Sequence, residues 1–262
     1  MKYLVVGPGA LGYFSLLGYL KSIEDKLEGI EELSGASAVA ILSLFISVGL
    51  SVDEIIKFSF DFNVPEFVKI DLECFFNKFG FVDIDPIRSK LIEFCKGNPK
   101  FKELNKKLHV SAFCLNTSKT EYFSVDTHPD MYVIDAVCMS MSIPFIFTST
   151  TYKGKTYVDG GLIEKYPFLP FIDKKPYEVH ITGIKSNTTF KENIESPIDL
   201  LQSVAEGAMK IREDYTKDIN KTVINVEDID VFDFDMGYED KLKLYFMGVN
   251  NMSGNIYGDQ QH

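Results

Sequence analysis

One segment near the start of the chain constrains the fold more than any other. It reads YLVVGPGALGYF from Tyr3 to Phe14, so a short apolar run leads into glycines at positions 7, 9 and 12, and apolar residues at helical spacing follow. A strand that turns through a glycine-rich loop into a helix is typical of α/β proteins. The loop presents backbone N–H groups, which can hold either a dinucleotide pyrophosphate or the oxyanion of a reaction intermediate.

Strands alternate with helices along most of the remaining chain. We expect strands at 30–37, 108–116, 120–126, 177–184 and 222–226, and a hairpin at 151–161 that closes on Lys153, Gly154 and Lys155. We expect helices over 13–28, 38–49, 85–95, 130–142, 197–219 and 238–248, and another that begins after a capping box formed by Ser51 and Glu54. This order predicts a single layered α/β domain over residues 1–262, with a mostly parallel central sheet flanked by helices.

Composition excludes several classes of protein. The formal net charge of −11 argues against nucleic acid as a partner, because phosphates require a basic surface. The longest apolar run, 38–50, is shorter than a membrane span, and the N-terminal segment has too many helix-breaking residues for a signal peptide. The four cysteines, at positions 74, 95, 114 and 138, form no C-x-x-C pair and indicate a reducing compartment. We therefore expect an intracellular protein that is soluble or peripherally associated with membranes.

No cofactor or metal is expected. The cysteines and the four histidines lack the spacing of metal ligands, and the acidic segment 227–235 lacks that of an EF-hand loop. A dinucleotide site would need an acidic residue about twenty positions after the glycine loop, at the end of a buried strand. The candidate acids lie in EDKLEGIEE, at 24–32, which is too polar for such a strand. A dinucleotide-binding oxidoreductase therefore stays a remote alternative.

Two further segments carry candidate catalytic residues. Residues 35–38, which read GASA, lie between a short strand and an apolar helix, which is the setting of a nucleophile elbow. Ser37 in this segment would also make a good helix N-cap. Far along the chain, Asp159 comes before two glycines at the end of the expected hairpin, where an aspartate also serves as an ordinary turn former.

In this order, the glycine loop, the serine segment and the aspartate segment resemble the patatin-like phospholipase family. Its members combine a glycine-rich loop after the first strand, a G-x-S-x-G serine and a distant D-G-[GA] aspartate. MSIPFIF at 141–147 and YVDGGLIEKYP at 157–167 are similar to the family's S-x-x-I-P segment and aspartate motif, and 224–248 resembles its closing strand and helix. The resemblance extends over the whole chain and implies a patatin-like fold.

The resemblance also implies a mechanism. Ser37 would be the nucleophile and Asp159 the group that takes its proton, provided that burial raises the aspartate pKa from its ordinary ~3.9. The implied reaction is hydrolysis of a lipid or lysolipid ester, of the phospholipase A or lysophospholipase type, through an acyl-enzyme. The remaining residues that the resemblance assigns are Gly7, Pro8, Gly9, Ala10, Leu11 and Gly12 in the oxyanion loop, Gly35, Ala36, Ala38 and Val39 in the elbow, and Gly160 and Gly161 after the aspartate.

Three positions depart from the family pattern. Pro8 replaces a glycine and has no N–H to offer an oxyanion, Leu11 replaces a basic residue, and Val39 replaces the last glycine of G-x-S-x-G. A β-branched residue in the first turn of a helix crowds a close crossing of strand and helix. These departures support an alternative, a catalytically impaired relative that binds lipid or a protein partner.

Aromatic and basic segments leave the question of membrane contact open. FSFDFNVPEFV at 58–68 and ECFFNKFGFV at 73–82 fit core packing, an acyl channel or contact with a bilayer surface. The lysines at 96–107 fit a solvated face or contact with lipid head groups. Transient contact with a membrane surface is compatible with both segments, and neither indicates an oligomeric state.

Overall fold

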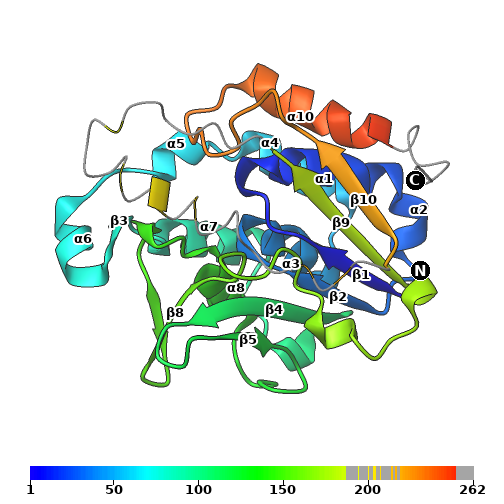
Figure 1. Cartoon of the computed structure of the whole chain (residues 1–262), viewed down its shortest axis with the longest axis horizontal. Helices are drawn as coiled ribbons and strands as arrows, with labels where there is room; N and C mark the ends of the chain where they lie inside the picture. Colours follow the sequence, from blue (N-terminus) through cyan, green and yellow to red (C-terminus); the bar gives the residue numbers. More distant parts are fainter. Residues whose placement is uncertain are drawn as a thin grey trace, which may run out of the picture.

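The structure is a computed structural model that describes residues 1–186 and 219–251, together with positions 194, 200, 203, 204, 207, 214 and 216. Within this part of the chain, the main sheet has the order β10-β9-β1-β2-β4-β8-β7, and β5 pairs with β4 (Figure 1). Strands β10, β9, β1, β2 and β4 are parallel, whereas β5, β7 and β8 are antiparallel additions at one side. The strands are β1 Tyr3–Val6, β2 Glu32–Gly35, β4 Lys107–Cys114, β5 Lys119–Phe123, β7 Thr150–Tyr152, β8 Lys155–Asp159, β9 Val179–Lys185 and β10 Lys221–Asn225, and a separate pair is formed by β3 Gly80–Val82 and β6 Phe145–Phe147.

Helices flank this sheet, and the predicted α/β class with a mostly parallel sheet is confirmed. They are α1 Tyr13–Ser22, α2 Glu24–Leu27, α3 Ala40–Val48, α4 Val52–Asp61, α5 Val64–Phe67, α6 Leu72–Lys78, α7 Asp85–Phe94, α8 Val133–Met141 and α10 Tyr238–Asn250. None of these helices combines the length and the apolar character needed to cross a bilayer. The helix expected over 197–219 lies outside the described residues, apart from isolated positions.

The prediction of a single helix over 13–28 is wrong, because the helix is interrupted at Ile23. Helix α1 ends at Ser22 and α2 starts at Glu24, because Ile23 leaves helical geometry with φ −115° and ψ 18°. The Ile23 N–H reaches back to the carbonyls of both Tyr19 and Leu20, and its side chain is buried. Periodicity alone did not reveal this break, since the apolar spacing continues through it.

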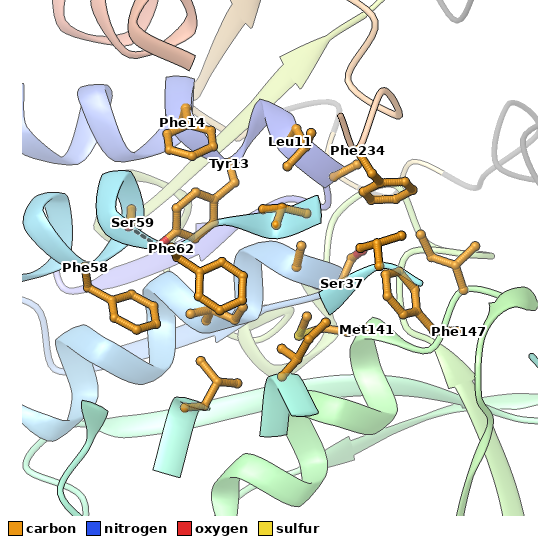
Figure 2. A pocket seen from close by; sticks show the side chains of 18 residues that line it. Leu11, Tyr13, Phe14, Ser37, Phe58, Ser59, Phe62, Met141, Phe147 and Phe234 are labelled. Carbon is orange, nitrogen blue, oxygen red and sulfur yellow. Dashed lines mark hydrogen bonds between the residues drawn. The ribbon is translucent and has the colours of Figure 1, made fainter. Parts of the chain in front are cut away.

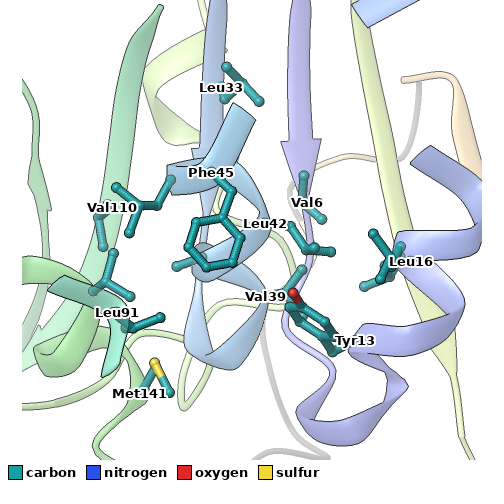
Figure 3. Packing of buried hydrophobic residues seen from close by; sticks show 14 of the residues in the cluster. Val6, Tyr13, Leu16, Leu33, Val39, Leu42, Phe45, Leu91, Val110 and Met141 are labelled. Carbon is teal, nitrogen blue, oxygen red and sulfur yellow. The ribbon is translucent and has the colours of Figure 1, made fainter. Parts of the chain in front are cut away.

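The two faces of β1 pack against different parts of the chain. Leu4 and Val6 belong to the main core. Figure 3 shows Val6 together with residues of α1, α3 and α8. Tyr3 and Val5 point the other way, into a smaller apolar cluster with residues between β8 and β9, such as Phe171. A strand buried on both faces has the continuous apolar character seen in YLVV.

Strand register determines where the functional loops meet. Val6, the last residue of β1, lies opposite Gly35, the last residue of β2, so the loops that follow both strands leave the same edge of the sheet. Strand β8 runs back along β4 and ends with Asp159 opposite Ala112, two residues beyond the point where β4 pairs with Gly35. The carboxyl ends of parallel strands are the usual ligand sites of open α/β sheets. The topology therefore brings the loop after β1, the turn after β2 and the end of β8 to one edge of the sheet, although they are distant in sequence.

Candidate active site

Ser37 occupies a sharp turn between β2 and α3. Its φ of +59° lies in the left-handed region, which non-glycine residues adopt rarely and which is typical of strained functional turns. A Cβ at Gly35 would lie 3.0 Å from the Cα of Ala40, so the glycine permits the close approach of strand and helix. Ser37 makes no N-cap hydrogen bond, and the N-cap interpretation of this serine is wrong.

The Ser37 hydroxyl instead donates to the Asp159 carboxylate, with 2.7 Å between Oγ and Oδ2. The other carboxylate oxygen accepts the Gly161 N–H at 2.7 Å, so the aspartate also closes its own turn. Asp159 is 1% exposed and Ser37 is 5% exposed. A hydroxyl and a carboxylate that are separated by 122 positions therefore meet in a buried hydrogen bond.

Glycines after Asp159 allow its turn to fit between neighbouring segments. A Cβ at Gly160 would lie 2.1 Å from the Ser111 carbonyl oxygen of β4, and a Cβ at Gly161 would lie 2.6 Å from the Cβ of Pro8. No side chain could occupy either position without displacing β4 or the glycine-rich loop. The D-G-G sequence is thus explained by close packing on both sides of the carboxylate.

Ser140, near the end of α8, connects the two candidate residues and was not singled out from the sequence. Its hydroxyl accepts the Ser37 N–H at 2.9 Å, and its carbonyl accepts the Gly160 N–H at 3.1 Å. The Asp159 N–H is held by the Ser142 carbonyl at 2.9 Å. Ser140 is the serine of the S-x-x-I-P sequence at 140–144. This motif is the one sequence feature that could have pointed to it.

Replacement of Ser140 by alanine is expected to lower kcat about tenfold to 100-fold with little change in KM. The variant leaves the buried Ser37 N–H without its acceptor, so the turn shifts and the nucleophile loses its alignment. Ser142→Ala is the matched control, because its hydroxyl binds the Cys138 carbonyl and its own carbonyl survives the substitution. Steady-state kinetics on a soluble ester compare the two. Equal kcat values for both variants would show that Ser140 does not position the site.

The glycine-rich loop presents fewer donors than its sequence suggested. Gly7 N–H binds the Thr182 carbonyl, Leu11 N–H binds the Val231 carbonyl, and Gly12 N–H binds the Gly9 carbonyl, at 2.8, 2.9 and 2.7 Å respectively. Within the described part of the chain, the N–H groups of Gly9 and Ala10 bind no acceptor. Ala38 follows the serine in the first turn of the short helix 37–39, where N–H groups lack intrahelical acceptors.

Each of the three departures from the family pattern is accommodated. Pro8 packs against Gly161, and its missing N–H leaves the donors of the two following residues available. Leu11 is buried and lines the pocket described below. Val39 is fully buried in the main core, while the close contact between strand and helix falls on Gly35 instead. The crowding expected at Val39 is therefore absent.

An apolar pocket opens beside Ser37. Its walls come from the glycine-rich loop, α3, α4, α5, α7 and the segments around β6 and Phe234, and Figure 2 shows Ser37 at one side among aromatic and aliphatic side chains. The lining residues are Ala10, Leu11, Tyr13, Phe14, Ser37, Ala38, Ile41, Phe58, Ser59, Phe62, Val64, Val68, Ile87, Leu91, Met141, Ile143, Phe147 and Phe234. Tyr13 and Ser59 bind each other at 2.7 Å, which satisfies both hydroxyls within the wall.

The electrostatics of the pocket favour neutral groups. Burial raises the pKa of the Tyr13 phenol, so this ring stays protonated at physiological pH. Among the described residues, no group of histidine, cysteine and carboxylate side chains has the arrangement of a metal site. The pocket is therefore an apolar space that has the Ser37 hydroxyl, hydrogen-bonded to Asp159, in its wall.

Comparison with known proteins identifies the family to which this chain belongs. Residues 4–172 match the family described as Patatin-like phospholipase, and the chain therefore belongs to the patatin-like phospholipase family. Uncharacterized protein R571 of Acanthamoeba polyphaga mimivirus is 27% identical over 278 residues, which cover 98% of this chain and 94% of that protein. Probable lipid hydrolase 463L of Invertebrate iridescent virus 6 is 26% identical over 215 residues, which cover 74% of this chain and 73% of that protein.

A solved structure shares the fold. VipD from Legionella pneumophila matches with a TM-score of 0.72 at 16% sequence identity, over 96% of this chain and 66% of the VipD chain. The likeness agrees with the family match and shows a common architecture. The chain spans about two thirds of VipD's length.

Proposed function

We propose that this protein is a lipid acyl hydrolase that cleaves carboxylic esters through Ser37 and Asp159. The observation that carries the proposal is the 2.7 Å hydrogen bond from Ser37 Oγ to Asp159 Oδ2 at the wall of an apolar pocket. A nucleophile and its proton acceptor within hydrogen-bond reach are the geometric requirement for covalent catalysis.

In the proposed reaction, Ser37 Oγ attacks the ester carbonyl while its proton passes to the Asp159 carboxylate. The carbonyl oxygen gains negative charge and is stabilised by the N–H groups of Gly9, Ala10 and Ala38. Collapse of this intermediate expels the alcohol, which takes the proton from Asp159, and leaves an acyl-enzyme. Asp159 then accepts a proton from water, which attacks the acyl group, and returns it to Ser37 as the fatty acid leaves.

The lining of the pocket supports a lipid acyl chain as the group that is transferred. Phenylalanine rings from α1, α4, β6 and the 226–236 segment line the pocket that contains Ser37, and the polar head of the substrate would stay outside. Burial of methylene groups supplies roughly 0.8 kcal/mol each, so a long acyl chain gains affinity that a short one lacks. We propose a phospholipase A or lysophospholipase type of reaction, and the name of the viral relative 463L is consistent with it.

The alternative of an impaired, lipid-binding relative loses much of its motivation. Pro8 leaves two loop donors available, Leu11 extends the apolar wall, and Val39 fits the core. Membership of the patatin-like family likewise replaces the dinucleotide interpretation of the glycine loop.

Release of fatty acid from phosphatidylcholine and lysophosphatidylcholine tests the proposal. We expect the purified protein to release free fatty acid from the ester-linked lipids, and none from ether-linked analogues of the same length, which have no carbonyl to attack. Mass spectrometry of the extracted lipids measures both products. Binding of lipid without any release of fatty acid would instead favour the impaired relative.

A further inference from the structure

An apolar surface lies at one end of the molecule, on α6 and the residues directly beside it. Neither α5 nor α6 contains a buried residue, although the segment 64–79 is rich in aliphatic and aromatic side chains. Four large apolar side chains there are more than 60% exposed, namely Ile70, Leu72, Phe76 and Phe79. Single exposed apolar residues are common, but four within ten positions are typical of an interaction surface. We call these four residues the α6 surface.

The segments on either side of the α6 surface connect it to residues that line the apolar pocket. Val68, which lines the pocket, comes just before Ile70 in the chain. After α6, strand β3 pairs with β6, where Phe147 also lines the pocket and Phe145 is partly exposed. In Figure 1, α6 projects from the left side of the molecule, away from the strands of the main sheet. The chain thus passes from the pocket lining at Val68 into the α6 surface, and then pairs through β3 with the strand that carries Phe147.

A fixed framework holds the exposed side chains outward. Asp71 caps α6 by accepting the N–H groups of Glu73 and Cys74, and its own N–H binds the Phe81 carbonyl at 2.7 Å. Phe75 stacks on Phe81 with 4.3 Å between ring centroids. The outward position of Phe76 is therefore a property of the folded helix.

The charges around the α6 surface indicate what it binds. Lys78 is paired with Asp83 at 2.8 Å and with Asp85 at 3.3 Å, so it offers no free positive charge. The chain as a whole carries a formal charge of −11, which repels anionic surfaces. Within 64–79, three carboxylates stand against Lys69 and the paired Lys78, so the surface is not basic. A partner without strong negative charge suits it, and a bilayer of zwitterionic phospholipid fits that description.

Three of the five lysines in the basic segment 96–107 are engaged with other groups of the protein. Lys102 pairs with Asp130, Lys107 pairs with Asp126 and Glu32, and Lys106 binds the carbonyls of residues 28 and 30. These side chains hold neighbouring segments together. The solvated-face interpretation of this segment fits these contacts better than an anchor for head groups.

We propose that the α6 surface inserts into the head-group layer of a zwitterionic bilayer and holds the pocket against the membrane. This inference rests on the proposed function, because a lipid substrate has to pass from the bilayer into the pocket. Insertion of apolar side chains at the interface depends little on salt, in contrast to attraction by basic residues.

A single indole reports on this surface, because the chain contains no tryptophan. In Phe76→Trp, we expect the emission to shift to the blue on addition of phosphatidylcholine vesicles, equally at low and high sodium chloride. Tyr177→Trp is the matched control: Tyr177 is 70% exposed and lies beside Glu178, whose carbonyl binds the Lys2 N–H at the opposite edge of the sheet. An indole at position 76 that does not respond to vesicles would overturn the proposal, as would a blue shift only with anionic lipid.

A second variant separates membrane binding from catalysis. Phe76→Asp combined with Phe79→Asp is expected to reduce hydrolysis of vesicle phospholipid roughly tenfold or more, and to leave hydrolysis of a soluble short-chain ester unchanged. Failure of the proposed function would appear differently, as a blue shift of the Phe76→Trp variant on vesicles while the wild type hydrolyses neither ester. Analytical ultracentrifugation tests the remaining occupant, a second copy of the chain. If the wild type self-associates, the double variant does not, and neither responds to vesicles, the surface belongs to a second copy and the bilayer proposal is refuted.

Discussion

Replacement of Ser37 by alanine is expected to lower kcat for ester hydrolysis by at least about 10³-fold while the fold is retained. The substitution removes the attacking oxygen and its hydrogen bond to Asp159. The measurement is fatty-acid release by each variant, with circular dichroism to verify folding. Asp159→Asn keeps the shape of the site but removes the proton acceptor, so we expect a loss of similar size.

Ser47→Ala is the control for this experiment. Ser47 is a fully buried serine of α3, and its hydroxyl binds no partner among the residues that the structure describes. Its removal should leave kcat unchanged, because the residue is remote from the dyad. Retention of more than a tenth of wild-type activity in Ser37→Ala would mean that another residue is the nucleophile.

Substitution of Gly248 by alanine is expected to cost about 3 kcal/mol of unfolding free energy. Helices α1 and α10 cross with their backbones in contact: a Cβ at Gly248 would lie 1.8 Å from the Ser15 carbonyl oxygen, and a Cβ at Gly18 would lie 1.9 Å from the Tyr245 carbonyl oxygen. Even one methyl group forces the helices apart, and backbone atoms cannot rotate away as a side chain can.

Urea denaturation measures this cost. Gly29→Ala is the matched control, because a Cβ there meets one atom at an ordinary contact distance of 3.7 Å. We expect that variant to unfold within about 0.5 kcal/mol of the wild type. An unfolding free energy of Gly248→Ala equal to that of Gly29→Ala would contradict the crossing of α1 and α10 at these glycines.

Local patterns predicted the parts of the fold that depend on neighbouring residues. The capping box at Ser51 and Glu54 is confirmed, with both reciprocal hydrogen bonds present at the start of α4. The hairpin that closes on Lys153 and Gly154 is also confirmed by the pairing of β7 with β8. Turn chemistry and helix caps act over three or four residues, so a single sequence contains the relevant information.

Contacts between distant segments were harder to predict. The role of Ser140 depends on a hydrogen bond that spans 103 positions, and no local pattern encodes it. The aromatic segment at 73–82 fits core packing by its sequence, but Phe76 and Phe79 are exposed. The sequence alone showed that Ser37 and Asp159 occupy positions of a family pattern. Their catalytic roles, the single domain over 1–262 and the cellular location stay predictions.

Labelling with a fluorophosphonate tests the central claim most directly. The reagent phosphonylates a serine only when its hydroxyl is activated as a nucleophile, and intact-protein mass spectrometry with peptide mapping locates the adduct. We predict one adduct at Ser37 in the wild type, much slower labelling in Asp159→Asn and none in Ser37→Ala. Wild-type protein that stays unlabelled, or that carries the adduct on another residue, would contradict the assignment of Ser37 and Asp159 as the catalytic pair.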